Sequence, residues 1–223
     1  MDIADSSLEV VGRLVDASNA SLLCSLEDGT QVIYKPIAGE RPLWDFPDGN
    51  LASREVAAFY ISELGDFAIV PKTVLRDGPF GMGAVQAWID TDESFDVTDL
   101  ASSSNLRIRE MALFDALINN ADRKFGHILY IDDSNILGCD HGVSFHTENK
   151  LRTVLWQFAD TPLKPEEIAK VGKVLDALDE KYLESLLTRS EIEAFIDRAR
   201  FLLEIGKFPM PNPNWPPVPW PPY

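Results

Sequence analysis

The chain has little positive charge for its length. Of its 223 residues, 20 are Lys or Arg and 36 are Asp or Glu, so the formal net charge at pH 7 is −16. Nucleic acids and anionic membrane surfaces repel a chain with this balance of charge. We therefore expect no nucleic-acid partner and no stable membrane association.

Cysteines and long apolar runs are also scarce. Cys24 and Cys139 are the two cysteines, too few for a disulfide framework and without the spacing of a zinc site. No run approaches the ~20 apolar residues that cross a bilayer. The acidic start, residues 1–5, has no basic leader before an apolar stretch. These features lead us to expect a cytoplasmic protein whose thiols are small buried side chains.

The first ninety residues predict an antiparallel sheet with one helix. An Asp28–Gly29 pair between two apolar runs is a strong hairpin signal. Residues 51–64 carry apolar side chains at helical spacing, with Ser53 as a candidate N-cap. The expected strands are residues 8–15, 21–26, 31–34, 69–75 and 83–89.

The second half predicts helices and an extended tail. Residues 106–118 and much of 164–205 read as helices, and 128–131 as a strand. Residues 208–223 hold eight prolines with Trp215, Trp220 and Tyr223, which predicts extended or polyproline II backbone. Large aromatic side chains bury much area when they find a surface. We expect this tail to dock on the protein itself, the alternative being a free ligand for a polyproline-binding partner.

Two carboxylates lie on loops at either end of a short apolar hairpin. Asp122 follows the helix 106–118, and Asp140 precedes a histidine and Gly142. Phosphoryl transfer from ATP uses one Asp to orient the acceptor hydroxyl and a second to hold the magnesium that bridges the phosphates. The spacing of the two residues is typical of that chemistry.

The segment resembles the Asp-Arg-His-x-x-Asn and Asp-Phe-Gly motifs of the phosphatidylinositol 3/4-kinase-like superfamily, which includes the HipA-like bacterial kinases. It is most similar to small actinobacterial proteins described as phosphatidylinositol-kinase-like. Residues 32–36 resemble the strand with the ATP lysine, residues 54–58 the helix with its glutamate partner, and residues 85–89 the hinge strand. The signals occur in the family's order.

The resemblance implies an α+β, bilobal protein-kinase-like fold with a reduced, mostly helical C-lobe. The N-lobe would cover residues 1–92, with a sheet, one helix and the ATP lysine. The C-lobe would cover residues 93–207 with the catalytic and metal-binding loops. Residues 208–223 would form the Pro/Trp-rich tail.

The resemblance also implies an ATP site. Lys35 would bind the phosphates and pair with Glu55, while Gln86 and Trp88 would flank the adenine at the hinge. The loop 16–21 lacks the glycine-rich pattern of protein kinases and a Walker lysine. Its Ser18 and Asn19 would bind phosphate instead, the alternative being an ordinary hairpin turn.

The catalytic and metal roles come from the same motifs. Asp122 would orient the acceptor and take its proton, and Lys124, in place of the usual His, would neutralise phosphoryl charge. Asp140 would hold the metal. His127 stands where the family has Asn, and imidazole suits Mn²⁺ or softer ions better than Mg²⁺. The second metal position is therefore altered or lost, or His127 binds phosphate. The clustering of all three histidines also leaves open a transition-metal site.

The acceptor is the least defined part of this expected site. Lys150 and Arg152 are the concentrated positive charge after the metal motif, and they are candidates to bind an anionic acceptor or simply a solvated charge pair. The resemblance implies an ATP-dependent kinase using Mg²⁺ or Mn²⁺, with a protein or small-molecule hydroxyl as acceptor and a lipid less favoured. The alternatives are a nucleotide-binding pseudokinase and a nucleotidyl transferase acting as a regulatory module. The oligomeric state stays open.

Overall fold

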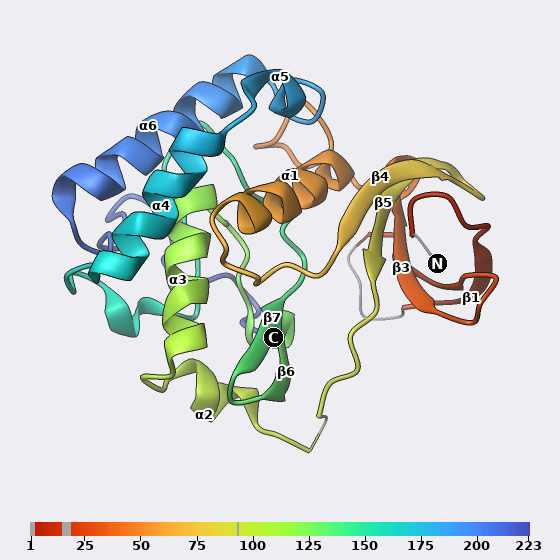
Figure 1. Cartoon of the computed structure of the whole chain (residues 1–223), viewed down its shortest axis with the longest axis horizontal. Coiled ribbons are helices and arrows are strands. Elements are labelled where there is room, and N and C mark those ends of the chain that lie inside the picture. Colours follow the sequence, from red (N-terminus) through yellow and green to blue (C-terminus); the bar gives the residue numbers. More distant parts are fainter. Residues whose placement is uncertain (1–2, 15–18, 93) are drawn as a thin grey trace.

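A five-stranded antiparallel sheet forms one side of the molecule in the computed structural model, which describes residues 3–14, 19–92 and 94–223 (Figure 1). The strand order is β1-β2-β3-β5-β4, so β4 and β1 are the edges. The strands are β1 Glu9–Arg13, β2 Leu22–Ser25, β3 Gln31–Pro36, β4 Thr73–Gly78 and β5 Gly81–Ala87.

Alternation along β3 sets which side chains face the helices. Val32 and Tyr34 are fully buried in a small apolar cluster together with Cys24 and Val85. Successive side chains of a strand point to opposite faces, so Lys35 lies on the other face. Lys35 is paired with Ala84 of β5. The sheet therefore buries one face of β3 and presents Lys35 on the face opposite this cluster.

Helix α1 (Leu51–Leu64) connects the sheet to the helical side. Its N-cap is Asn50, whose side chain accepts a hydrogen bond from the Ser53 amide at 2.7 Å, so the prediction of Ser53 as the cap is wrong. Asn50 has the extended backbone that a cap needs. Arg54 is buried and pairs with Glu191 at 2.7 Å. This ion pair fastens α1 to a helix far along the chain.

The remaining elements are helical except for one hairpin. The hairpin strands β6 (Ile128–Asp132) and β7 (Asn135–Gly138) are antiparallel. The α-helices are α2 Val97–Ala101, α3 Leu106–Ile118, α4 Pro165–Ala177, α5 Glu180–Leu183 and α6 Arg189–Ile205. Three short 3₁₀ turns are η1 Ile37–Gly39, η2 Phe125–His127 and η3 Trp156–Phe158.

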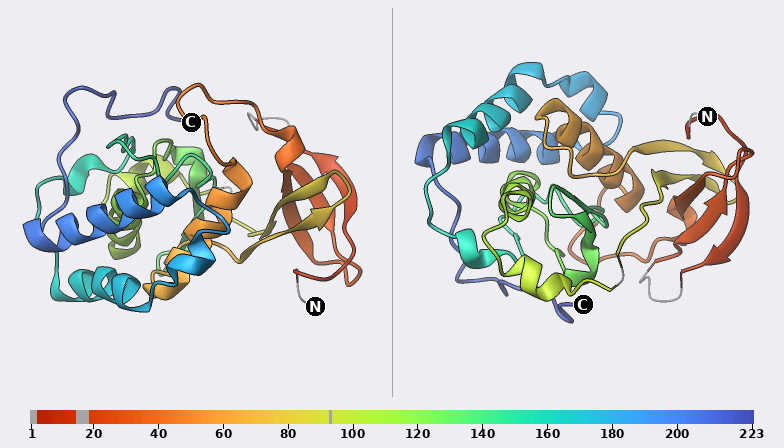
Figure 2. Two further views of the ribbon diagram at one scale, coloured as in Figure 1. Left: turned by 90° about the horizontal axis from the view of Figure 1, so that it is seen from above. Right: turned by 60° about the horizontal axis from the view of Figure 1, so that its bottom comes forward.

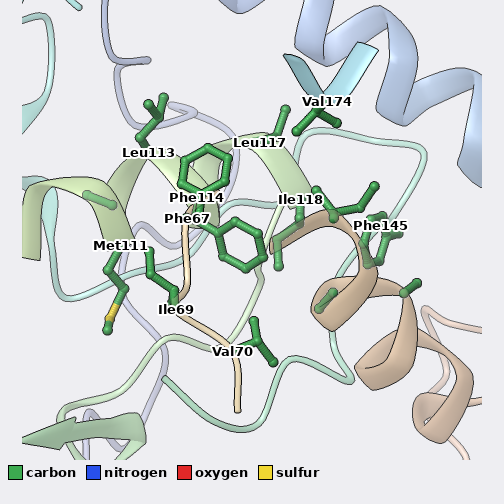
Figure 3. Packing of buried hydrophobic residues seen from close by; sticks show 14 of the residues in the cluster. Phe67, Ile69, Val70, Met111, Leu113, Phe114, Leu117, Ile118, Phe145 and Val174 are labelled. Carbon is green, nitrogen blue, oxygen red and sulfur yellow. The ribbon is translucent and has the colours of Figure 1, made fainter. Parts of the chain in front are cut away.

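The main core surrounds α3 and takes in residues from the link between α1 and β4 (Figure 3). The Phe67 and Phe114 rings lie 5.3 Å apart. Ile69 is fully buried and its amide bonds the Ser62 hydroxyl at 3.0 Å. Ile69 and Val70 therefore belong to the helical core, and the strand expected over 69–75 begins only at Thr73. No helix of the described residues is long and apolar enough to cross a bilayer.

The tail docks on the chain's own surface (Figure 2, left view, dark blue). The Pro217 carbonyl accepts hydrogen bonds from the Thr153 amide at 3.0 Å and the Trp156 indole at 2.7 Å. The Pro222 carbonyl accepts one from the Phe125 amide at 2.9 Å.

The aromatic side chains of the tail behave differently from one another. Trp215 is half-buried, whereas Trp220 is 89% exposed and Tyr223 is 66% exposed. The hydrogen bonds of Pro217 and Pro222 show that backbone carbonyls hold the tail, and the Trp220 and Tyr223 side chains contribute little burial.

Truncation after Phe208 should lower the melting temperature by several degrees. It removes the carbonyls that satisfy two backbone amides, at about 1 kcal/mol for each hydrogen bond. About 1 kcal/mol moves the midpoint of a chain of this size by ~2–4 °C. Calorimetry checks this, with Trp220→Ala as a control that should leave the midpoint unchanged. An unchanged midpoint after truncation, with residues 209–223 open to protease in the full chain, would contradict the docking.

Candidate functional site

The loop after α3 is ordered by two asparagines. Asn119 ends the helix in the left-handed conformation, with φ of 56°. Its side-chain amide donates to the carbonyls of His146 and Glu148 at 2.9 and 2.7 Å. The Asn120 side chain donates to Asp115 at 2.9 Å and accepts from the Asp122 amide at 3.0 Å. The backbone that carries Asp122 is therefore fixed on both sides.

Arg123 and Asp115 form an ion pair with no solvent exposure. Two guanidinium nitrogens, Nε and Nη2, each lie 2.9 Å from an Asp115 carboxylate oxygen. The third nitrogen, Nη1, donates to the carbonyls of His127 and Cys139 at 3.0 and 3.1 Å. One buried side chain thus joins α3 to both loops of the candidate site.

His141 packs in the position where the resemblance has Phe. Its ring meets Phe114 edge-on at 5.7 Å. Its Nε2 lies 2.7 Å from an Arg123 nitrogen, and arginine can only donate, so the histidine proton is on Nδ1. Burial and then the Arg123 charge hold the pKa of His141 well below its usual range. The ring is a neutral packing group, which leaves the three histidines without a shared metal site.

Lys35 lies between two carboxylates. Its Nζ is 2.6 Å from Glu55 Oε1 and forms a second ion pair with Asp140 Oδ1. The other oxygen of Glu55 accepts from the His141 amide at 3.0 Å. Burial opposes the charge of Lys35, but the Asp140 and Glu55 carboxylates outweigh it and raise the pKa of Lys35. The Lys35 charge lowers the pKa of Asp140 well below its usual range. Both groups are ionised at neutral pH.

The backbone is constrained at both Asp140 and Gly142. Asp140 itself has the left-handed conformation, with φ of 56°, and Gly142 is outside the positive-φ region. A Cβ on Gly142 would lie 3.0 Å from the Leu51 side chain and 3.2 Å from the Leu51 carbonyl oxygen. Glycine at this position avoids a tight contact with the start of α1.

His127 and Asp140 fit a divalent metal as a pair of ligands. His127 Nε2 lies 3.4 Å from Asp140 Oδ2, a separation that one ion can bridge. Burial lowers the pKa of His127, so the ring keeps the lone pair that a metal ligand needs. The described part of the chain holds no group of three or more acidic, histidine or cysteine side chains suited to a metal. Phosphate oxygens and water would complete the shell, as is usual for Mg²⁺ in phosphotransfer sites.

Asp122 remains accessible beside a cation. Its side chain is 28% exposed, and Oδ2 lies 3.2 Å from Lys124 Nζ. The carboxylate is free enough to meet a ligand hydroxyl, and Lys124 adds positive charge on the same loop.

The residues expected to bind adenine and phosphate form hydrogen bonds within the chain. Gln86 shares the sheet face of Lys35 but is buried and donates to Thr73 Oγ1 at 2.8 Å. The Trp88 indole donates to Asp90 at 3.0 Å. Asn19 accepts from the Arg41 amide at 2.8 Å. Ser18 lies outside the described residues.

Lys150 and Arg152 differ sharply from the solvated pair that the sequence left open. Lys150 is buried, 3.2 Å from Asp45 Oδ2 and 4.9 Å from the Trp215 ring centroid. Arg152 donates from Nε to the Ala121 carbonyl at 2.6 Å and lies 5.4 Å from the same ring. Lys150 is neutralised by its own chain, and Arg152 is held next to Asp122.

Sequence reasoning missed Asp115 and Trp215. A signal for Asp115 was available, because a carboxylate within an apolar helix is almost never buried unpaired. No local signal pointed to Trp215, since its contacts with Lys150 and Arg152 span more than sixty residues of sequence.

Comparison with known proteins defines the fold. The sequence matches no protein-family model. It is 40% identical to protein Rv2133c of Mycobacterium tuberculosis, over 98% of this chain and 93% of the relative.

Among solved structures, the Golgi casein kinase with Mn/ADP bound has a TM-score of 0.59 at 14% identity, over 91% of this chain and 73% of that one. The Helicobacter pylori proinflammatory kinase CtkA has 0.53 at 11%, over 93% and 95%. Hydra Fam20 with sugar has 0.57 at 14%, over 91% and 85%. These likenesses show a kinase-like α+β fold.

Asp115→Asn should destabilise the chain strongly. The change leaves the Arg123 guanidinium buried without its counter-charge, and breaking a buried pair costs roughly 3–5 kcal/mol. Urea unfolding should show that loss. Glu193→Gln is the matched control, since it removes an exposed partner of Arg189 and should leave the curve unchanged. Equal curves for the two variants would mean that the buried pair does not hold the loops.

Proposed function

The chain belongs to the same family as protein Rv2133c of Mycobacterium tuberculosis. From its kinase-like fold and the residues of the candidate site, we propose that it is an ATP-dependent kinase. It transfers the γ-phosphoryl group to an alcohol hydroxyl. The observation that carries the proposal is the assembled set Lys35, Glu55 and Asp140, in which one ammonium meets both carboxylates. A kinase-like fold with this set has the parts that bind and polarise nucleotide phosphates.

The phosphate-binding side is built on the sheet and α1. Lys35 binds the ATP phosphates. Its ion pair with Glu55 orients the Lys35 side chain between the sheet and the loops that carry Asp122 and Asp140. Gln86 and Trp88 belong to the adenine side, and Asn19, with Ser18 before it, to the phosphate loop. The Mn/ADP found in the Golgi casein kinase structure supports nucleotide and a divalent ion here, Mg²⁺ or Mn²⁺.

The transfer is done by the two loops. Asp122 accepts the proton of the acceptor hydroxyl. The oxygen of that hydroxyl then bonds to the γ-phosphorus. The bond between the γ-phosphorus and the β–γ bridging oxygen breaks, and ADP leaves. Lys124 stabilises the charge on the moving group. A divalent ion held by Asp140 and His127 would neutralise the phosphates.

We place the chain in the phosphatidylinositol 3/4-kinase-like and HipA-like group of kinases by its motifs. The N-lobe then ends near residue 92, the C-lobe covers 93–207, and the tail is 208–223. The net charge of −16 disfavours a lipid acceptor at an anionic bilayer. His127 in the Asn position favours one rival reading, a nucleotide-binding pseudokinase.

ATP with metal should stabilise the protein through Asp140. A ligand at a hundred times its Kd stabilises by about 2.7 kcal/mol, and therefore by several degrees. ATP plus Mn²⁺ should raise the wild-type melting midpoint more than ATP with chelator. Asp140→Ala should lose the metal-dependent part, because it removes a metal ligand. The exposed Asp176→Ala on α4 serves as control, and identical metal responses of Asp140→Ala and wild type would refute the assignment.

Asp122→Asn should separate chemistry from binding. The amide keeps the shape but cannot take a proton, so turnover should fall by roughly the 10²–10⁴ typical of general acid–base groups. Nucleotide affinity, measured by calorimetry, should stay within a few-fold because Asp122 does not contact Lys35 or Asp140 through any hydrogen bond or ion pair of the described residues. Wild-type rates of ADP formation in this variant would refute the role of Asp122 as the general base.

A further inference from the structure

Arg152 is held as an open guanidinium fork beside Asp122. Its Nε donates to the Ala121 carbonyl at 2.6 Å, which belongs to the peptide bond leading into Asp122. Its backbone extends the same contact, since the Arg152 amide donates to the Asn120 carbonyl at 3.0 Å and its carbonyl accepts from the Arg123 amide at 3.1 Å. The side chain is therefore fixed to the catalytic loop.

The two terminal nitrogens of Arg152 are left for a ligand. Among the described residues no carboxylate forms an ion pair with Arg152, although the chain has 36 acidic residues for 20 basic ones. The Trp215 ring supports the guanidinium at 5.4 Å. A planar fork fixed by Nε and an aromatic ring is preorganised for a phosphate or carboxylate.

Lys150 does not compete for such an anion. It is buried, paired with Asp45 and flanked by the Trp44 and Trp215 rings at 5.5 and 4.9 Å. The Asp45 carboxylate neutralises it within the chain. Of the two cations expected to bind an acceptor, only Arg152 is without a carboxylate partner among the described residues.

The tail occupies backbone hydrogen-bonding groups on both sides of Arg152 and in the loop after Asp122. An extended peptide docks through backbone hydrogen bonds to exposed groups. Here the tail already takes three such groups, the Asn149 carbonyl through Asn212 and the amides of Thr153 and Phe125. Phe125 is three residues from Asp122, which is at most about 10 Å of chain.

We propose that the acceptor is a small alcohol bearing an anionic group, and that Arg152 binds that group beside Asp122. The tail, with Trp215 against the fork, closes the site to polypeptides. This inference rests on the proposed kinase function and adds the class of acceptor. The anion could also be the γ-phosphate of ATP, so the test fills that position first.

The test measures binding of inorganic sulfate, a tetrahedral dianion, by isothermal titration calorimetry. The protein carries a nonhydrolysable ATP analogue and Mn²⁺, so the γ-phosphate position is occupied. Sulfate should bind wild type, and Arg152→Gln should weaken binding roughly 10- to 100-fold, as expected for lost charge-assisted hydrogen bonds. Arg152→Lys should fall between, because it keeps the charge without the fork. Arg200→Gln, at an exposed arginine of α6, should bind as wild type.

Three results would overturn the inference. The first is no sulfate binding in wild type, or equal binding in Arg152→Gln. The second is that sulfate binds to the protein loaded with ADP but not to the protein loaded with the ATP analogue, and that Arg152→Gln also weakens ATP binding. Arg152 would then bind the γ-phosphate and not the acceptor. The third is faster phosphorylation of casein than of glycerol 3-phosphate or ribose 5-phosphate.

Turnover with paired acceptors separates recognition from structural support. Glycerol 3-phosphate against glycerol, and ribose 5-phosphate against ribose, differ in the anionic group alone. Arg152→Gln should raise KM for the phosphorylated member and leave the neutral member unchanged, whereas a merely structural loss lowers kcat for both. A wild type that gains no stability from the analogue and metal would refute the kinase function itself, which keeps the two failures distinct.

Discussion

The site depends on one buried ion pair between Arg123 and Asp115. Neither side chain is exposed to solvent, and the guanidinium also holds the His127 and Cys139 carbonyls. Asp122 and Asp140 lie on different loops whose separation this guanidinium fixes. A buried pair of this kind is a weak source of net stability but costs much when one partner is lost. Its main effect here is geometric, because it fixes the position of the Asp122 loop relative to the Asp140 loop.

Local patterns predicted most of the fold. The helices over 51–64 and 106–118 were expected with the bounds that they have, since apolar spacing and an abrupt change to polar residues mark both. The α+β class and the antiparallel sheet are confirmed. The strand expected from residue 69 was wrong because Ile69 and Val70 look equally apolar in a strand and in the helical core that buries them.

The site was predictable where a motif carries its own chemistry. Lys35, Glu55 and Asp140 were expected near one another, and the structure brings them together. Roles set by long-range contact escaped the sequence. The residues next to Lys150 in sequence do not indicate that Asp45 pairs with it. Those next to Arg152 do not indicate its contact with the Trp215 ring. Composition gave the net charge but no indication of which cation stays unpaired.

The ion pair between Arg54 and Glu191 determines which parts of the molecule can move. Arg54 precedes Glu55 in α1, and its partner Glu191 is in α6, so this ion pair attaches α1 to the helical side of the molecule. The chain connects the sheet to α1 through residues 37–50 and 65–72. A motion that changed the distance between the sheet and α1 would therefore bend these connectors, together with the segment from β5 to α2. Lys35 would move with the sheet, whereas Glu55 would keep its position on α1. The ion pair between them would form again when the sheet returned toward α1.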